Sequence, residues 1–278
     1  MEIPTYYDIE EAHNRIRKFI HETPIFYSEG INRLTSANIF FKCENLQKVG
    51  AFKYRGATNA VQLLTDTEAQ HGVLTHSSGN HAQALALAAK TRGIRAYIVM
   101  PINSSRAKIN AVEEYGGEIY FCEPTLKARE EKAREIQEQT GATFIHPYDN
   151  PNIIAGQGTV AKEMFQILGT LDAILAPIGG GGLMSGTAIA TKFLSPYTKI
   201  YGVEPANADD ARRSLEKGEI VEMINPNTIA DGLRTQLSPL TFAIIQDKVN
   251  RIFAVSEESI IKSMRLIWER LKLVVEPS

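Results

Sequence analysis

The sequence predicts an α/β fold with two open, twisted, mainly parallel sheets flanked by helices. Three observations support this. Short apolar segments alternate with helical segments of about ten to seventeen residues over most of the chain. The helical segment 125–141 carries a single apolar stripe, as a helix packed on one side of a sheet does. Gly141 follows that helix, where a glycine commonly ends one. Such alternation is typical of βαβ units and parallel sheets.

The expected elements follow one another in regular order. The strand-like segments are 72–78, 95–101, 118–124, 143–148, 171–182 and 198–205, and the helical segments between them are 80–93, 104–117, 125–141, 152–169 and 183–194. Segment 80–93 is apolar on most sides, so we expect it to be more deeply buried. The stripe of the helix at 125–141 consists of Leu126, Ala128, Ala133 and Ile136.

The number of βα units suggests a division into two domains. The units between residues 71 and 148 predict one compact open sheet, a small domain that would hold the substrate. Residues 1–70 and 149–278 would form a larger, discontinuous cofactor-binding domain. A chain of 278 residues is long enough for two such cores.

Composition excludes several classes of function. The formal net charge is −2, which gives no electrostatic basis for binding nucleic acid or an acidic membrane surface. The sequence has no apolar run of about eighteen residues and no signal-peptide core at its start. The two cysteines, Cys43 and Cys122, lie far apart in apolar segments and indicate buried thiols. We therefore expect a cytoplasmic protein without a disulfide.

The stretch VGAFKYRGATNA, residues 49–60, sets Lys53 between two aromatic residues and close to two glycines. Lysine is mostly exposed in proteins. Desolvation lowers the pKa of a lysine and leaves its amine nucleophilic, which is what imine formation requires. A lysine that extends from a turn to solvent is the alternative interpretation.

The stretch PIGGGGLMSG, residues 177–186, follows an apolar strand and opens a helix. Consecutive glycines let the N–H groups of the main chain point at one anion, and phosphate is the expected guest. The dinucleotide pattern G-x-G-x-x-G fails here, and no G-K-[ST] follows. A tight turn without a ligand is the alternative.

The stretch SSGNHAQA, residues 77–84, lies where a strand ends and a helix begins, at the edge where open α/β sheets bind ligands. Its hydroxyl, amide and imidazole groups could hold a carboxylate. Capping of the helix by Ser77 or Ser78 is the alternative. Together the three motifs supply an amine nucleophile, a phosphate site and a carboxylate site, which pyridoxal phosphate and an amino-acid substrate require.

With these motifs, the sequence resembles the fold type II pyridoxal-phosphate enzymes, in the branch of serine racemases and serine/threonine dehydratases. The resemblance covers essentially the whole chain and includes FFKCENLQKVGAFKYRGATNA, THSSGNHAQALA, AGQGTVAKE, PIGGGGLMSG, YGVEPANADDARRS, TIADGL and VVEPS. It implies a fold like that of the tryptophan synthase β subunit. It also implies a homodimer.

The resemblance implies roles for matching residues. Lys53 would be the Schiff-base lysine, and Phe52 would lie beside the cofactor ring. Asn80 would bind the 3′-oxygen of the cofactor, and Gly232 would approach the ring through its main chain. The phosphate would be held by Gly179, Gly180, Gly181, Gly182 and Leu183, and the substrate carboxylate by Ser77, Asn80 and His81.

Ser78 bears on the choice of reaction. Lys53 can remove the Cα proton from one face of the substrate. Racemisation needs a second acid/base on the other face. In the serine racemases, a serine at this place in the motif has that role. A role in binding or capping alone is the alternative for Ser78. Elimination needs only loss of the β-hydroxyl, which yields a keto acid and ammonia. Arg129 matches a residue near the substrate hydroxyl, although a solvated helix face is an equal alternative.

The stretch EPANADD suggests a divalent metal. Oxygen ligands on an irregular loop suit Mg²⁺ or Ca²⁺, and Mn²⁺ is a further possibility. With the resemblance, we expect a structural site formed by Glu204, the Ala208 carbonyl and Asp210. Helix capping near Asp209 is the alternative interpretation.

The expected function is dehydration or racemisation of serine or threonine, or both in one active site. Dehydration of 3-hydroxyaspartate is an alternative substrate assignment. Two other classes remain open, a non-catalytic amino-acid or nucleotide sensor and a purely structural α/β protein. Relatives usually continue through a further helix and strand whose hydroxyl or thiol partners the pyridine nitrogen. The sequence ends at VVEPS, so we expect this C-terminal part to be missing.

Overall fold

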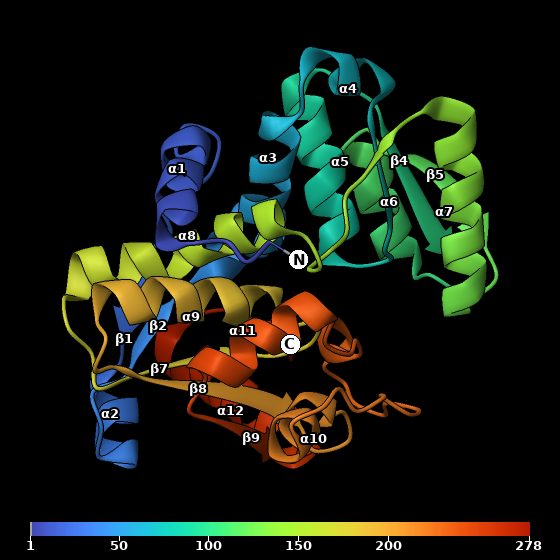
Figure 1. The fold of residues 1–278 in the computed structure, drawn as a ribbon. Helices are drawn as coiled ribbons and strands as arrows, with labels where there is room; N and C mark the ends of the chain where they lie inside the picture. Colours follow the sequence, from blue (N-terminus) through green and yellow to red (C-terminus); the bar gives the residue numbers. More distant parts are fainter. Residues whose placement is uncertain (1) are drawn as a thin grey trace.

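The computed structural model describes residues 2–278, and it contains two parallel sheets and a small antiparallel pair (Figure 1). The four-stranded parallel sheet has the order β5-β4-β3-β6, and the three-stranded one the order β7-β8-β9. The strands are β1 (Ile25–Tyr27), β2 (Phe40–Lys42), β3 (Val73–His76), β4 (Ala96–Pro101), β5 (Glu118–Cys122), β6 (Thr143–Phe144), β7 (Ala173–Pro177), β8 (Lys199–Pro205) and β9 (Arg251–Val255). The predicted α/β fold class is confirmed.

Helices connect the parallel strands and cover both sheets. The α-helices are α1 (Tyr6–Ile16), α2 (Glu29–Thr35), α3 (Lys53–Leu63), α4 (Asp66–His71), α5 (Asn80–Arg92), α6 (Arg106–Glu114), α7 (Leu126–Thr140), α8 (Pro151–Leu168), α9 (Gly182–Leu194), α10 (Asp210–Lys217), α11 (Pro239–Lys248) and α12 (Glu257–Leu271). Three short 3₁₀ helices complete the described elements, η1 (Glu44–Leu46), η2 (Lys48–Gly50) and η3 (Asp231–Leu233). Within residues 2–278, no helix is long and apolar enough to cross a membrane.

Local sequence signals explain where several helices begin and end. Asn150 caps α8 by accepting N–H bonds from Asn152 and Ile153, and Pro151 occupies the first turn, where proline is favoured. Gly141 ends α7 in the left-handed conformation, as predicted. The apolar stripe of α7 is only half correct, because Ala133 and Ile136 are buried while Leu126, at the first turn, is 56% exposed.

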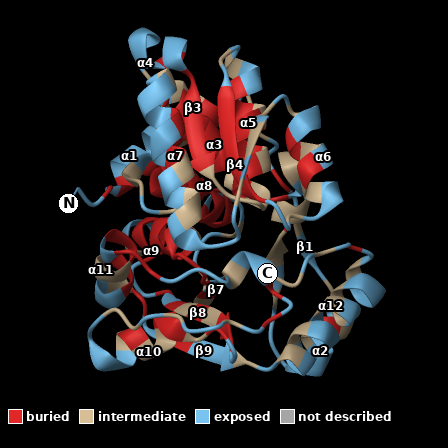
Figure 2. Cartoon of the chain, turned by 90° about the vertical axis from the view of Figure 1, so that its right-hand side faces the viewer, coloured by how far each residue is buried: buried red, intermediate tan, exposed pale blue. Residues whose placement is uncertain are grey.

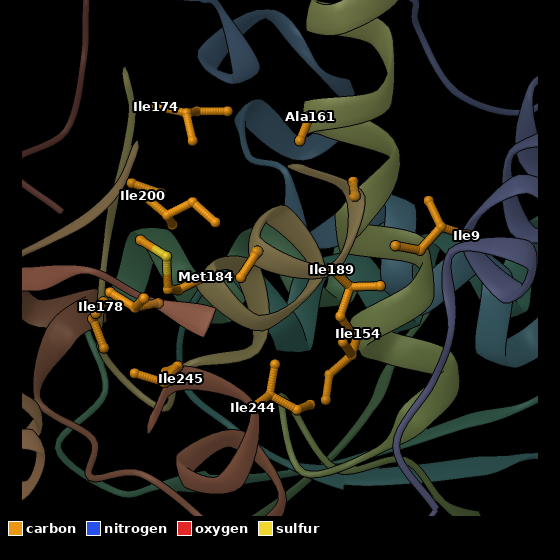
Figure 3. Close-up of a cluster of buried hydrophobic side chains, with 14 of the residues drawn as sticks. Ile9, Ile154, Ala161, Ile174, Ile178, Met184, Ile189, Ile200, Ile244 and Ile245 are labelled. Atoms are coloured by element: carbon orange, nitrogen blue, oxygen red, sulfur yellow. The ribbon is translucent and has the colours of Figure 1, made fainter. Parts of the chain in front are cut away.

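The buried core divides along the two sheets. One cluster joins α1, α8, α9 and α11 to the strands β7–β9, and Figure 3 shows its isoleucines with Met184 between them. A second cluster packs α3 and α5 against β3 and β4, and every residue of β4 is buried. Figure 2 shows the same distribution, with β3, β4, α8 and α9 buried and α4 and α12 largely exposed. As predicted, α5 is buried on most sides.

Close main-chain contacts hold α3, α8 and α9 together. A Cβ atom at Gly156 of α8 would come within 2.5 Å of the Cα of Gly56 on α3. A Cβ at Gly158 would come within 2.9 Å of the Gly186 carbonyl oxygen on α9. Only glycine allows two helix backbones to approach this closely, so α8 contacts its two neighbouring helices from opposite sides of the same turn.

The structure differs from the sequence-based elements in several places, and the strand expected at 171–182 is only β7, Ala173–Pro177. β1 and β2 form a separate antiparallel pair of three-residue strands, which the alternation did not predict. The strand expected at 143–148 is only Thr143–Phe144, because the Nδ1 atom of His146 accepts the N–H groups of Tyr148 and Asp149 and turns the chain. The whole four-stranded sheet lies between residues 73 and 144, and the domain boundaries at 71 and 148 stay a prediction.

Candidate active site

Several loops meet near the carboxyl ends of the parallel strands. They are the β3–α5 loop, the β6–α8 loop and the β7–α9 loop, joined there by the start of α3, by η3 and by the last residues of the chain. The β6–α8 loop lies in the middle of this group. Its carbonyls and its tyrosine contact the start of α3, the start of α5 and the glycine-rich turn before α9.

Lys53 is the first residue of α3 and is partly buried. Its Nζ atom donates to the carbonyl oxygen of Pro147 at 3.0 Å and lies 5.3 Å from the centre of the Phe52 ring. Burial lowers the pKa of Lys53 to about 8, because the charged ammonium is poorly solvated there. A substantial fraction of the amine is therefore neutral and nucleophilic near neutral pH.

The glycine-rich turn, residues 179–182, presents a row of unused donors. Gly181 has a φ of +86°, a left-handed conformation that suits glycine, and it is the N-cap of α9. Within residues 2–278, the main-chain N–H groups of residues 179–184 donate no hydrogen bond. A helix N-terminus with several free N–H groups favours a bound anion.

Other parts of the chain pack directly on this turn. A Cβ at Gly180 would collide with the ring of Tyr148, and one at Gly182 would lie 2.9 Å from the Cβ of Tyr148. A Cβ at Gly179 would lie 3.0 Å from the carbonyl oxygen of Gly232. The turn therefore has room for glycine alone, and Gly232 lies next to it.

The residues of the SSGNH motif lie at the start of α5. Its N-cap is Gly79, which has no side-chain capping bond, so the interpretation of Ser77 or Ser78 as a simple helix cap is wrong. The Oγ of Ser77 instead accepts the Gly79 N–H at 3.3 Å. Within the described chain, the N–H groups of Asn80 and His81 donate no hydrogen bond. They remain available to an anion.

The side chains of Asn80 and His81 point in different directions. The Nδ2 of Asn80 donates to the Glu276 carboxylate at 2.6 Å. His81 is 2% exposed, and its Nε2 lies 3.1 Å from the Ile145 carbonyl oxygen. Burial, with the nearby Lys53 charge, lowers the pKa of His81 to about 3, so the ring is neutral. The imidazole supports the β6–α8 loop through Nε2, its Nδ1 has no hydrogen-bond partner, and the main-chain N–H of His81 stays available to a ligand.

The last residues of the chain reach the site. The N–H of Gly232 donates to the Ser278 Oγ at 3.0 Å, and Asn45 donates to the Val274 carbonyl at 3.1 Å. Burial raises the pKa of Glu276, which accepts from Asn80. The segment 274–278 thus connects η1 and η3 to the start of α5.

Arg129, on α7, is partly buried, and its Nε donates to the Thr125 carbonyl at 3.4 Å. Burial is the main cause that lowers the pKa of His76, at the end of β3, and the positive charge of Arg129 is the second largest cause. The same charge opposes the rise in the pKa of Tyr148. Arg129 is therefore within electrostatic range of His76 and Tyr148.

The carboxylates predicted to bind a metal are deeply buried. Both carboxylate oxygens of Asp210 lack a hydrogen-bond partner, whereas those of Glu204 accept the N–H groups of Ala211 and Arg212. Burial raises the pKa of Glu204 to about 8 and that of Asp210 to about 7. Within residues 2–278, the Ala208 carbonyl accepts no hydrogen bond, and no three His, Cys, Asp or Glu side chains form a metal cluster.

These donor sets fit the expected groups. The free N–H groups of residues 179–184 suit a phosphate, and Lys53 offers an amine to an aldehyde. The unpartnered Asp210 carboxylate, the Glu204 carboxylate and the Ala208 carbonyl are hard oxygen ligands of the kind that Mg²⁺ and Ca²⁺ bind. The roles of individual site residues stay predictions.

Sequence reasoning missed Tyr148, Pro147 and Glu276. An aromatic residue at the end of the segment predicted as a strand, close to the edge where open α/β sheets bind ligands, could have drawn attention to Tyr148. Nothing in the sequence indicates that the Pro147 carbonyl accepts from Lys53, which lies 94 positions earlier. Glu276 falls in the quoted VVEPS motif, but its contact with Asn80 spans 196 positions.

Comparisons with known proteins agree with this geometry. Residues 16–278 match the family described as pyridoxal-phosphate dependent enzyme. The beta-hydroxyaspartate dehydratase of Paracoccus denitrificans is 49% identical over 100% of this chain and 88% of its own length. The serine racemase of Dictyostelium discoideum is 48% identical over 99% of this chain and 85% of its own. The crystal structure of the T.th. threonine deaminase aligns with a TM-score of 0.94 and 44% identity, covering 99% of this chain and 89% of its own.

Proposed function

Because the chain belongs to the pyridoxal-phosphate dependent enzyme family, we propose that it dehydrates small β-hydroxy amino acids such as serine or threonine, racemises them, or does both in one site. The observation that carries the proposal is that the neutralisable amine of Lys53 and a turn with six free N–H groups both contact the β6–α8 loop. The products of dehydration are a keto acid and ammonia. Relatives named for each reaction support this breadth.

Pyridoxal phosphate, when bound, supplies an aldehyde for an amine and an electron sink for negative charge at Cα. The N–H groups of residues 179–183 would hold its phosphate. Phe52 and Gly232 would flank the ring, and the Asn80 amide would contact the 3′-oxygen. These residues would bind and orient the group, and the burial of Lys53 would keep its amine reactive.

Proton transfer would be the work of Lys53 and Ser78. The Lys53 amine would accept the Cα proton on one face, since its lowered pKa lets it exist without a proton near neutral pH. For racemisation, the Ser78 hydroxyl would deliver a proton to the opposite face. For dehydration, only the first transfer is needed before the hydroxyl leaves. Within the described chain, Ser78 makes no side-chain hydrogen bond, which leaves its hydroxyl free for this role.

The substrate carboxylate would be bound by the free N–H groups of Asn80 and His81, with Ser77 beside them. Arg129 would lie toward the β-substituent. The positive charge of Arg129 would also suit a substrate that carries a second carboxylate. One relative, 49% identical to this chain, is named beta-hydroxyaspartate dehydratase. 3-Hydroxyaspartate is therefore a second candidate substrate.

We also propose a divalent cation, Mg²⁺ or alternatively Ca²⁺ or Mn²⁺, at Glu204, the Ala208 carbonyl and Asp210. It would neutralise two buried carboxylates whose pKa values are raised by burial. This site uses residues of β8 and the start of α10 and makes no contact with Lys53. Its role would be structural.

A homodimer in the cytoplasm is the remaining part of the proposal. The two cysteines are free thiols, as expected in a reducing compartment. Large apolar side chains are exposed on β1, β2 and α2, among them Tyr27 at 60% and Leu34 at 69%. Such residues are typical of a surface that a second copy covers. Sedimentation velocity tests the dimer, and a Tyr27→Glu variant should shift it toward monomer.

The central experiment measures the cofactor and the products together. Purified protein with pyridoxal phosphate should show the visible absorbance of the lysine-bound cofactor, and Lys53→Ala should lose it. Lys48→Ala, a nearby lysine outside the site, is the matched control and should keep it. Keto acid and chirality are then assayed with serine, threonine and 3-hydroxyaspartate. A bound cofactor with neither product would refute the enzyme and favour an amino-acid sensor.

Two variants separate the reactions. Ser78→Ala should abolish racemisation while keto acid is still formed from L-serine. Arg129→Gln should reduce turnover of 3-hydroxyaspartate more than that of serine, if the guanidinium binds the second carboxylate. Equal losses for both substrates would exclude that assignment.

A further inference from the structure

Five largely buried side chains form a charge cluster below the first turn of α3, and we call it the Arg55 cluster. Its members are Lys42, Glu44, Arg55, Thr159 and Glu163. Arg55 is fully buried and donates from Nε and Nη2 to Glu44, both at 2.8 Å. It also donates from Nη1 and Nη2 to Glu163 at 2.6 and 2.9 Å, and from Nη1 to Thr159 at 3.1 Å.

The positive and negative charges of the cluster balance. Lys42 donates to Glu163 at 2.5 Å, so two cations face two carboxylates. Buried ion pairs of this kind contribute little net stability compared with well-packed apolar residues, because each ion loses its hydration. What two bidentate pairs do provide is a fixed orientation, since the planar guanidinium matches each carboxylate in only one arrangement.

That orientation bears directly on Lys53. Arg55 lies two residues after Lys53, in the first turn of α3. The N-cap of this helix, Phe52, makes no side-chain capping bond, so the turn is not held in the usual way. It is held instead by the Arg55 cluster, by the Gln157 side chain of α8, which accepts the Gly56 N–H at 3.3 Å, and by the close contact between Gly56 and the backbone of α8.

We infer that Arg55 is a positioning residue for Lys53, one that fixes the first turn of α3 through Glu44 and Glu163 so that the lysine amine faces the glycine-rich turn. This rests on the proposed covalent attachment of the cofactor to Lys53. Without the guanidinium fork, the uncapped turn can fray, and the Nζ atom loses its place beside the Pro147 carbonyl. A displacement of about 1 Å at such a site can cost about a hundredfold in rate.

The test compares wild type with Arg55→Lys and with Val61→Ala. Lysine keeps the positive charge but cannot form the bidentate pairs with Glu44 and Glu163. Val61 is fully buried further along α3, so Val61→Ala weakens the same helix without touching the cluster. Each protein is mixed with pyridoxal phosphate and reduced with borohydride, and the label on the Lys53 peptide is quantified by mass spectrometry. Thermal unfolding and the kcat and KM for serine are measured alongside.

Arg55→Lys should attach the cofactor about ten to a hundred times more slowly, with kcat lowered and KM for serine nearly unchanged. Val61→Ala should lower the melting temperature but label as fast as wild type. Normal labelling of Lys53 in folded Arg55→Lys would overturn the inference, as would equal slowing in Val61→Ala. If wild type itself takes up no label, the proposed function fails, which is a separate result.

Thr159→Val keeps the test decisive if Arg55→Lys does not fold. This isosteric change removes the hydrogen bond to the guanidinium and the one that Thr159 donates to the Gly156 carbonyl, and it leaves both carboxylates in place. Labelling of Lys53 should slow by a few fold, in the same direction as for Arg55→Lys. Unchanged labelling in this variant would count against the positioning role.

Discussion

Two groups of buried carboxylates lie in this molecule, and their surroundings are opposite. Glu163 sits between Lys42 and Arg55, and these partners lower its pKa despite burial. Glu204 and Asp210 are equally buried but face no cation at bonding distance, and burial raises the pKa of both. The first group is complete with the residues of the chain, whereas the second would be neutralised by an added cation or by protons.

The largest effect of any single substitution should come from breaking the complete group. Glu163→Gln leaves Lys42 and Arg55 buried with Glu44 as their only carboxylate, and loss of one partner from a buried pair costs about 3–5 kcal/mol of unfolding free energy. Urea unfolding measures it. Glu269→Gln, which removes an exposed pair with Arg265, is the control and should leave the midpoint unchanged. Equal midpoints for both variants would contradict the comparison.

A divalent cation should stabilise the second group only. At Mg²⁺ concentrations of about 100 times its Kd, the protein should gain about 2.7 kcal/mol, because the ion binds the folded state alone. Thermal unfolding with and without Mg²⁺, after chelator treatment, measures this gain. Asp210→Asn should abolish it and Glu163→Gln should preserve it. A gain that survives in Asp210→Asn would place the ion elsewhere.

The second group should also make metal-free protein sensitive to pH. The pKa values of about 8 for Glu204 and about 7 for Asp210 exceed those of unfolded carboxyl groups, near 4. The folded state therefore binds more protons, and its stability falls as the pH rises from about 5 to 8, by up to about 1.4 kcal/mol per pH unit for each proton. Urea midpoints across this range check it. A flat profile with chelator would be inconsistent with unneutralised carboxylates.

The smallest effect should come from removing one charge of the second group. Without metal at pH 8, Asp210→Asn should raise the free energy of unfolding by about 1–2 kcal/mol, since a neutral amide is cheaper to bury than an unpartnered carboxylate. The exposed neighbour variant Asn207→Asp should bring no such gain. Destabilisation by Asp210→Asn in metal-free buffer would show that the carboxylate has a partner in the chain.

The sequence predicted what depends on local pattern. The alternation of segments gave the parallel sheets and the position of the ligand-binding edge, and the unusual settings of Lys53 and of residues 179–182 pointed to the chemistry. Contacts between segments that lie far apart in the sequence could not be predicted from these local patterns. Arg55 meets Glu163 across 108 positions, and no local rule specifies that pairing. β6 is short because the His146 ring takes up two N–H groups, which depends on its rotamer.

The glycine contacts along α8 have one more consequence. Gly156 touches the helix that carries the amine, and Gly158 touches the helix that begins at the glycine-rich turn. The separation of these two functional groups is therefore set by main chain lying directly on main chain. A single methyl group at position 156 or 158 would push the lysine and the turn apart.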